Sequence, residues 1–173
     1  MRYLILFSMI MISLNNVGQS PEKVSVKLPV KDYEVKVVRF AELEKVIKKN
    51  DNKLYVVNFW ATWCMPCVQE LPDFMEVNKM YQSNPNFKMI LVSLDIASDV
   101  ESAVRPFLKK NKMDVNVYLL DDNKHMNDWI PAVDKQWTGA IPATVLYRNG
   151  VKLAFRESKI GKIELVELIR NYL

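Results

Sequence analysis

The sequence holds two cysteines, Cys64 and Cys67, and only Met65 and Pro66 separate them. A pair at this spacing can close a structural disulfide, ligate a metal ion or exchange a disulfide with another molecule. As a structural staple, that is, a disulfide that only stabilises the fold, the pair adds little stability. Closing so short a loop contributes only about 2 kcal/mol in the chain-entropy model. A chain of 173 residues can bury a full core without it. The staple is therefore the less favoured interpretation.

A metal site is the second interpretation. Zinc takes four protein ligands, or three and a water molecule. Beyond the cysteine pair the chain has one histidine, His125, which lies far along the sequence. The methionines after the N-terminal segment are scattered rather than clustered for copper: Met65, Met75, Met80, Met89, Met113 and Met126. We expect neither a metal nor a cofactor.

The surroundings of the pair favour redox catalysis. An apolar run typical of a buried strand, Leu54–Trp60, comes before it, and a helical pattern over 64–81 follows. The start of a helix stabilises a thiolate and lowers its pKa from about 8.5 into the range of about 3.5–7.5. We therefore expect Cys64 to be exposed and to attack a substrate disulfide, and Cys67 to resolve the mixed disulfide. Pro66 stands where the first helical turn tolerates proline.

The other elements predict an α/β domain. Strand patterns cover 34–40, 54–60, 87–95, 115–120, 143–147 and 151–156, and helical patterns cover 41–49, 64–81, 100–110 and 124–137. The last of these helices should break near Pro131, and Gly161 should cap one more, with Ile163, Val166 and Ile169 facing inward. Strands that alternate with helices and close in a hairpin predict a mixed central sheet flanked by helices.

The N-terminus has the order of a signal peptide. Arg2 is followed by an apolar run over 3–14 and by small or polar residues over 15–20. The run is shorter than the roughly 20 residues of a membrane-spanning helix. We expect residues 1–18 to be a signal peptide cleaved near Gly18, or a short uncleaved anchor. Residues 19–32 would be a linker and 33–173 the folded domain, located in the periplasm or cell envelope.

The net charge of +4 comes from 24 basic and 20 acidic residues whose signs are interleaved. The longest basic runs are pairs such as Lys48-Lys49 and Lys109-Lys110. A nucleic-acid binder usually gathers its charge on one face. We therefore interpret the charges as solvated surface and expect no nucleic-acid partner.

The run over 57–67 closely resembles the active site of the thioredoxin-like family. With Glu70-Leu71-Pro72 after it, the chain is similar to the exported TlpA/ResA-like branch. A second run, over 137–144, is similar to the family's cis-proline loop. The resemblance extends from about residue 34 to the C-terminus, and the segment 115–137 fits the strand and helix that this branch inserts. It implies a thioredoxin fold.

By this resemblance Pro142 would be cis and would face the cysteines, and the backbone of Ile141 would pair with a substrate peptide like an added strand. From the residues alone, Pro142 could equally be the start of a strand. We expect Trp63, Met65 and Pro66 to contact substrate and Trp60 to lie in the core.

Asn58 stands where thioredoxin itself has a buried acid, and asparagine cannot take a proton. Glu70 is the candidate replacement, because it lies three residues after Cys67 and shares a helical face with Phe74 and Val77. A carboxyl group on an apolar face has a raised pKa, which suits proton exchange with a thiol. The alternative is an acid that only complements the helix dipole.

The sequence thus predicts a monomeric thiol–disulfide oxidoreductase outside the cytoplasm that acts on protein thiols and disulfides. The resemblance implies a reductase that supports cytochrome c maturation. A membrane or periplasmic redox partner would supply its electrons. An oxidase or isomerase stays open, since the reduction potentials of proteins of this fold range from about −270 to −120 mV. A non-catalytic metallochaperone that uses the cysteine pair is the alternative of another class.

Overall fold

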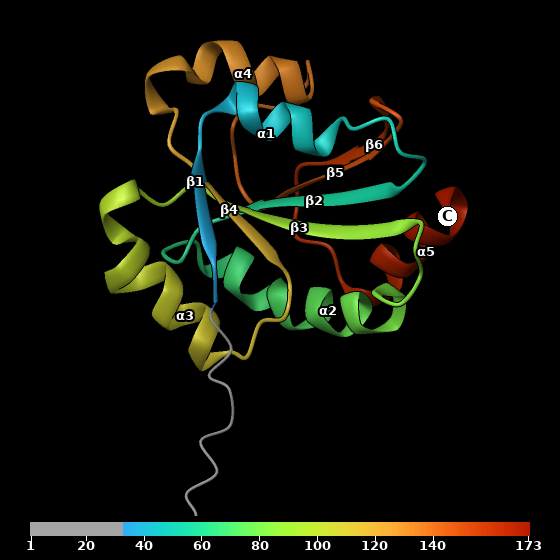
Figure 1. Cartoon of the computed structure of the whole chain (residues 1–173), viewed down its shortest axis with the longest axis horizontal. Helices are drawn as coiled ribbons and strands as arrows, with labels where there is room; N and C mark the ends of the chain where they lie inside the picture. The colour runs from blue at the N-terminus through green and yellow to red at the C-terminus, as the bar shows by residue number, and fades with distance from the viewer. Residues whose placement is uncertain (1–32) are drawn as a thin grey trace, which may run out of the picture. The chain divides into compact units, whose positions relative to one another are not determined.

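A six-stranded sheet forms the centre of the computed structural model, which describes residues 33–173 (Figure 1). The strands are β1 (Val35–Val38), β2 (Leu54–Trp60), β3 (Phe87–Ser93), β4 (Asn116–Leu120), β5 (Ala143–Arg148) and β6 (Val151–Arg156). Their order across the sheet is β1-β4-β3-β2-β5-β6. The expected signal peptide and linker, 1–18 and 19–32, lie outside the described residues.

Five of the strands run in one direction and β5 alone runs against them. β1 pairs with β4, β4 with β3 and β3 with β2 in parallel register, whereas β5 is antiparallel to both β2 and β6. The carboxyl ends of β1, β2, β3 and β4 therefore share one edge of the sheet. Ligands of open α/β sheets bind at this edge, and the cysteine motif directly follows β2.

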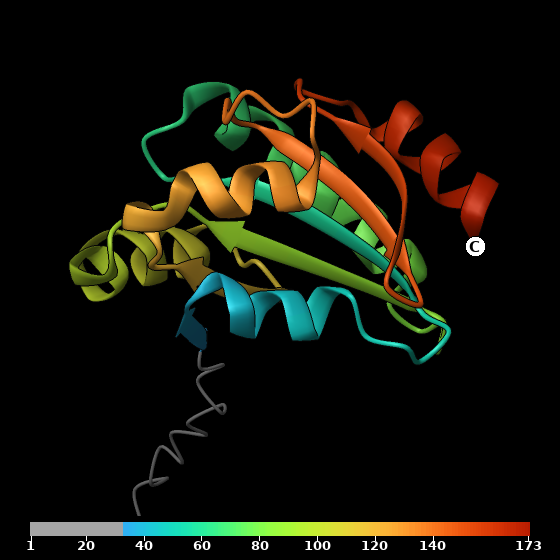
Figure 2. The same cartoon turned by 90° about the horizontal axis from the view of Figure 1, so that it is seen from above.

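Helices cover both faces of the sheet (Figures 1 and 2). On one face lie α1 (Phe40–Ile47) and α4 (Met126–Val133), and on the other lie α2 (Met65–Tyr81), α3 (Arg105–Lys110) and α5 (Lys162–Tyr172). Short helical turns make up the rest: η1 (Ala97–Asp99), η2 (Val100–Val104) and η3 (Asn123–His125).

Strand β2 is buried along its whole length because both of its faces are covered. Tyr55, Val57 and Phe59 pack toward α1 and α4. The alternate residues face the other layer, where Val56 packs with α2 and α5 and Trp60 with α2 and α3. Asn58 belongs to this second set by its position, so the strand's one polar side chain faces the layer that contains α2.

The α/β class and mixed sheet predicted from the sequence are confirmed, and β2 has the predicted bounds. The break predicted near Pro131 is wrong, because α4 continues to Val133 and the N–H of Asp134 still donates to the carbonyl of Ile130, at 3.2 Å. Burial of Trp129 and Val133 against the sheet holds this last turn in place despite the proline.

The inward-facing residues of α5 are also partly different from those expected. Ile163 is 77% exposed, and the buried residues are Leu165, Leu168 and Ile169. The helix begins at Lys162 with Gly161 as its N-cap, so the apolar stripe starts at Leu165 and leaves Ile163 in the solvated first turn. Within residues 33–173 no helix is long and apolar enough to cross a membrane.

Candidate active site

Cys64 and Cys67 form a disulfide at the start of α2. Cys64 is the N-cap residue in extended conformation, and its Sγ accepts a hydrogen bond from the backbone N–H of Cys67 at 3.4 Å. Pro66 occupies the first turn, as expected, where its missing N–H costs nothing. The atom that would carry charge as a thiolate therefore lies at the positive end of the helix.

The expectation that Cys64 is exposed is wrong for this disulfide form. Cys64 is 5% exposed and Cys67 is fully buried. The reason is tertiary: Ile141, from a segment far along the chain, packs against the cluster that contains both cysteines, and its carbonyl oxygen lies 3.7 Å from Cys64 Sγ. Cys64 is still the more accessible residue of the two.

The side chains next to Cys64 do reach solvent. Trp63 is 68% exposed and Met65 is 66% exposed, and Pro66 is exposed as well. Trp60, in contrast, is fully buried, as the sequence predicted. Exposed apolar side chains around a reactive group are typical of a surface that contacts a partner.

The Ile141–Pro142 peptide bond is cis. Pro142 is buried and directly precedes β5, which pairs with β2. This pairing brings the segment before β5 next to the loop after β2, so the two sequence motifs meet although more than half of the described chain separates β2 from β5.

Glu70, a residue of α2, lies in a buried polar network. Its Oε1 accepts from Asn58 Nδ2 at 2.8 Å and its Oε2 accepts from the backbone N–H of Ile160 at 2.9 Å. Asn58 Nδ2 also donates to Thr144 Oγ1 at 3.1 Å. Asn58, Glu70 and Thr144 are each at most 1% exposed. The network joins β2, α2, β5 and the connection to α5.

Burial raises the pKa of Glu70 to about 7, against the lowering effects of the hydrogen bonds from Ile160 and Asn58 and of the nearby Lys159 charge. The carboxyl group therefore exchanges its proton near neutral pH. Glu70 is also one helical turn after Cys67, on the same face of α2. Asn58 cannot titrate, but it holds the carboxyl group that does.

Asp95, which sequence reasoning missed, anchors the loop before Cys64. Its carboxylate accepts from the backbone N–H and the hydroxyl of Thr62 at 3.0 and 2.6 Å, and from Ser93 Oγ at 2.6 Å. Asp95 is 3% exposed. A signal existed: Asp95 lies just past the end of β3, a buried strand that runs parallel to β2, so it reaches the same sheet edge as the cysteine motif.

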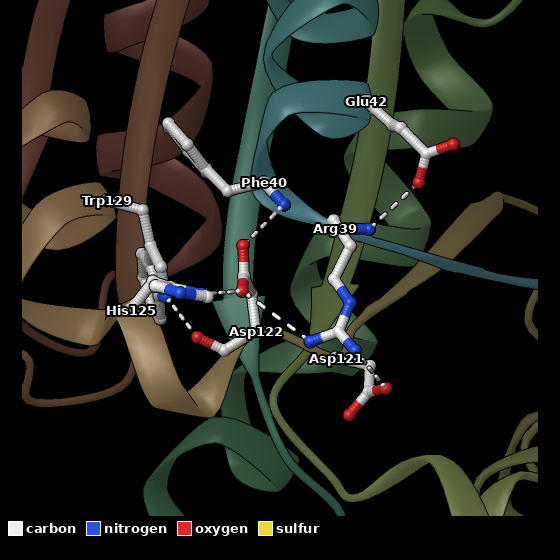
Figure 3. Close-up of polar contacts among 7 residues, drawn as sticks. All are labelled: Arg39, Phe40, Glu42, Asp121, Asp122, His125 and Trp129. Carbon is white, nitrogen blue, oxygen red and sulfur yellow. Dashed lines mark hydrogen bonds and ion pairs between the residues drawn. The ribbon is translucent and has the colours of Figure 1, made fainter.

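A second polar cluster lies where β1 and β4 end (Figure 3). Asp122 accepts from the backbone N–H of Phe40 at 3.0 Å, contacts His125 Nδ1 at 2.7 Å and lies 3.6 Å from the Arg39 guanidinium. Its carbonyl oxygen accepts from Trp129 Nε1 at 3.0 Å. His125 is a mostly exposed surface residue.

This cluster orients an aromatic core beneath the cis-proline loop. Trp129 packs with Phe59 and with Trp137, at ring distances of 6.4 and 5.6 Å. Trp137 in turn donates from Nε1 to the carbonyl of Ala140 at 2.8 Å. The segment 115–137, which the resemblance assigned to an inserted strand and helix, thus supports the cis-proline loop through Trp129 and Trp137. Among residues 33–173, no group of three or more histidine, cysteine or acidic side chains could hold a metal ion.

The model of the AhpC/TSA family matches residues 24–155. The Sporulation thiol-disulfide oxidoreductase A of Bacillus subtilis is 27% identical over 54% of this chain and 56% of its own length. The Thiol-disulfide oxidoreductase ResA of Bacillus cereus is 35% identical over 43% of this chain and 41% of its own length. The chain thus spans about half the length of the curated relatives it matches.

Solved structures share the fold. A thiol:disulfide interchange protein of the thioredoxin family from Chlorobium tepidum superposes with a TM-score of 0.59 at 22% identity, over 74% of this chain and 83% of its own. StoA from Bacillus subtilis gives a TM-score of 0.54 at 22% identity, over 70% of this chain and 85% of its own. The predicted thioredoxin fold is confirmed.

The pKa of Glu70 predicts how stability depends on pH. Between its ordinary value of 4.5 and about 7, the folded protein holds a proton that the unfolded chain has lost, so the free energy of unfolding falls as pH rises. We expect Glu70→Gln to remove a decline of about 3 kcal/mol across this window, measured by urea unfolding of the oxidised protein. The exposed Glu164→Gln serves as control. Equal slopes of the free energy of unfolding against pH in both variants and the parent would contradict the raised pKa of Glu70.

Proposed function

The chain belongs to the AhpC/TSA family, and from this membership and the geometry of the cysteine pair we propose that it is a thiol–disulfide oxidoreductase acting on other proteins. One observation carries the proposal. Cys64 caps α2 with its sulfur at the helix start, bonded to Cys67 and beside the cis-proline loop. A pair used only as a staple has no need of this position.

The proposed exchange starts from the reduced protein. The Cys64 thiolate attacks one sulfur of a substrate disulfide, which forms a mixed disulfide and releases the other substrate sulfur as a thiolate. The Cys67 thiolate then attacks Cys64 Sγ, and the second substrate sulfur leaves. Two electrons pass from the protein dithiol to the substrate, and the protein ends with the Cys64–Cys67 disulfide.

The second step needs a proton acceptor inside the protein, because Cys67 is fully buried. We propose Glu70 for this role. It lies one turn further along α2, and burial raises the pKa of its carboxyl group to about 7, close to the working range of a base at neutral pH. In the reverse direction the same group returns the proton to Cys67.

Substrate would bind over the exposed side chains of Trp63, Met65 and Pro66. The backbone of Ile141 would pair with the extended substrate chain, as an added strand does at a sheet edge. Such pairing through main-chain atoms tolerates many substrate sequences, which suits a protein that acts on other proteins.

We propose that the protein works as an exported reductase, in the periplasm or cell envelope, and that it supports cytochrome c maturation with electrons from a membrane redox partner. The basic and apolar order of residues 2–14 supports export. N-terminal sequencing of the protein recovered from the cell envelope tests both its export and the cleavage of its signal peptide.

Replacement of the attacking sulfur tests the enzyme proposal. We expect Cys64→Ser to lower insulin reduction by at least about a hundredfold, since no nucleophile remains. Cys67→Ser should instead accumulate a mixed disulfide between Cys64 and substrate, visible on non-reducing gels. Retained activity in Cys64→Ser, or metal bound in stoichiometric amount to the purified protein, would favour the metallochaperone.

The reduction potential of the Cys64–Cys67 couple decides the direction of electron flow. For a reductase we expect a value toward the thioredoxin end of the range, about −270 mV, measured by equilibration with glutathione or dithiothreitol. A value near about −120 mV would assign the protein as an oxidase, and an intermediate one as an isomerase.

The role of Glu70 has its own signature. We expect the rate of the resolving step to rise with pH through about 7 in the parent and to lose this inflection in Glu70→Gln, with a rate at least about tenfold lower above it. Glu76→Gln is the matched control, because Glu76 is an exposed acid of the same helix that pairs with Lys162. An unchanged profile in Glu70→Gln would leave Glu70 a structural residue.

A further inference from the structure

The carboxylate of Glu157 binds the loop before the cis-proline bond. Glu157 directly follows β6, and its Oε1 accepts from the backbone N–H groups of Thr138 and Ala140, each at 3.0 Å. The hydroxyl of Thr138 donates to the same oxygen, and Oε2 lies 3.2 Å from the Thr138 nitrogen. One side chain therefore satisfies every donor that Thr138 and Ala140 offer.

Ala140 is held from both sides by side chains. Its N–H donates to Glu157, and its carbonyl oxygen accepts from Trp137 Nε1 at 2.8 Å. Between Thr138 and Ala140, Gly139 has a φ of +94°, a conformation that any other residue adopts at a cost. The loop thus takes its shape from these two anchors rather than from pairing in the sheet.

The next residue after Ala140 is Ile141, whose carbonyl oxygen lies 3.7 Å from Cys64 Sγ. The peptide unit that joins Ala140 to Ile141 carries the carbonyl held by Trp137. A shift of Ala140 therefore moves the Ile141 backbone relative to the reactive sulfur.

We propose that Glu157 is a positioning residue for the exchange reaction: through Thr138 and Ala140 it holds the Ile141 backbone where an extended substrate chain pairs beside Cys64. This inference rests on the proposed oxidoreductase function. It adds a residue from the connection after β6, outside both sequence motifs, to the determinants of protein-substrate affinity.

The charge of Glu157 suits this role. Partial burial opposes ionisation, but the hydrogen bonds from Thr138 and Ala140 outweigh it and lower the pKa of Glu157. The carboxylate is therefore ionised at neutral pH, and hydrogen bonds to an ionised acceptor are about twice as strong as neutral ones. Glutamine at this position keeps one oxygen acceptor without the charge, so it should preserve the loop in part.

The test separates loop positioning from the chemistry at Cys64. In Glu157→Ala we expect the KM for insulin reduction to rise about tenfold while kcat stays within about twofold. The rate of Cys64 alkylation by iodoacetamide, a small probe that needs no contact with the loop, should stay within about twofold. Glu157→Gln should have a KM between those of the parent and Glu157→Ala.

Glu164→Ala is the matched control, because Glu164 is a nearby exposed acid of α5 that contacts Arg156 and not the loop. It should keep the parent's KM. Amide hydrogen exchange at Thr138 and Ala140, which needs no activity, should accelerate in Glu157→Ala and not in Glu164→Ala.

An unchanged KM in Glu157→Ala would overturn the inference, and so would a parallel loss of insulin reduction and Cys64 alkylation, which indicates general damage to the site. If the parent itself reduces no insulin, the proposed function fails. In that case the amide exchange of Thr138 and Ala140 still decides whether Glu157 holds the loop.

Discussion

The position of Cys64 at the start of α2 is the constraint on which the rest of the site depends. As N-cap residue its backbone is extended, so its sulfur turns back to the free N–H of Cys67 while the helix continues behind it. A shifted helix start would separate this sulfur from the N–H group that donates to it. The fully buried strand β2 before it fixes where that start lies.

Three carboxylates serve the site at different distances from solvent, and their surroundings determine what each can do. Glu70 is fully buried beside neutral donors, which leaves its pKa near neutrality and suits it to proton exchange. Asp95 holds the loop before Cys64 by accepting from the backbone N–H and the hydroxyl of Thr62. Glu157 remains partly exposed and keeps its charge. Burial thus sets Glu70 apart, while Asp95 and Glu157 anchor the loops on either side of the cysteine pair.

Much of this could be read from residue patterns, because the patterns are local. The apolar run of β2, the Asn149-Gly150 hairpin and the proline in the first turn of α2 each have a physical cause within a few residues. Expectations failed where distant packing outweighed local preference. Helix α4 passes Pro131 because Trp129 before it and Val133 after it are both buried, and Cys64 is covered because Ile141 packs over it.

By itself the sequence predicted the cysteine pair at a helix start, the α/β class and an acid with a raised pKa on the same helix, since spacing along one strand or helix decides these. Only the tertiary structure decided which groups surround them. The pairing of β5 with β2 brings Ile141 to Cys64, and the loops after β3 and β6 bring Asp95 and Glu157. No local pattern encodes such contacts, because they join segments that meet only once the sheet has formed.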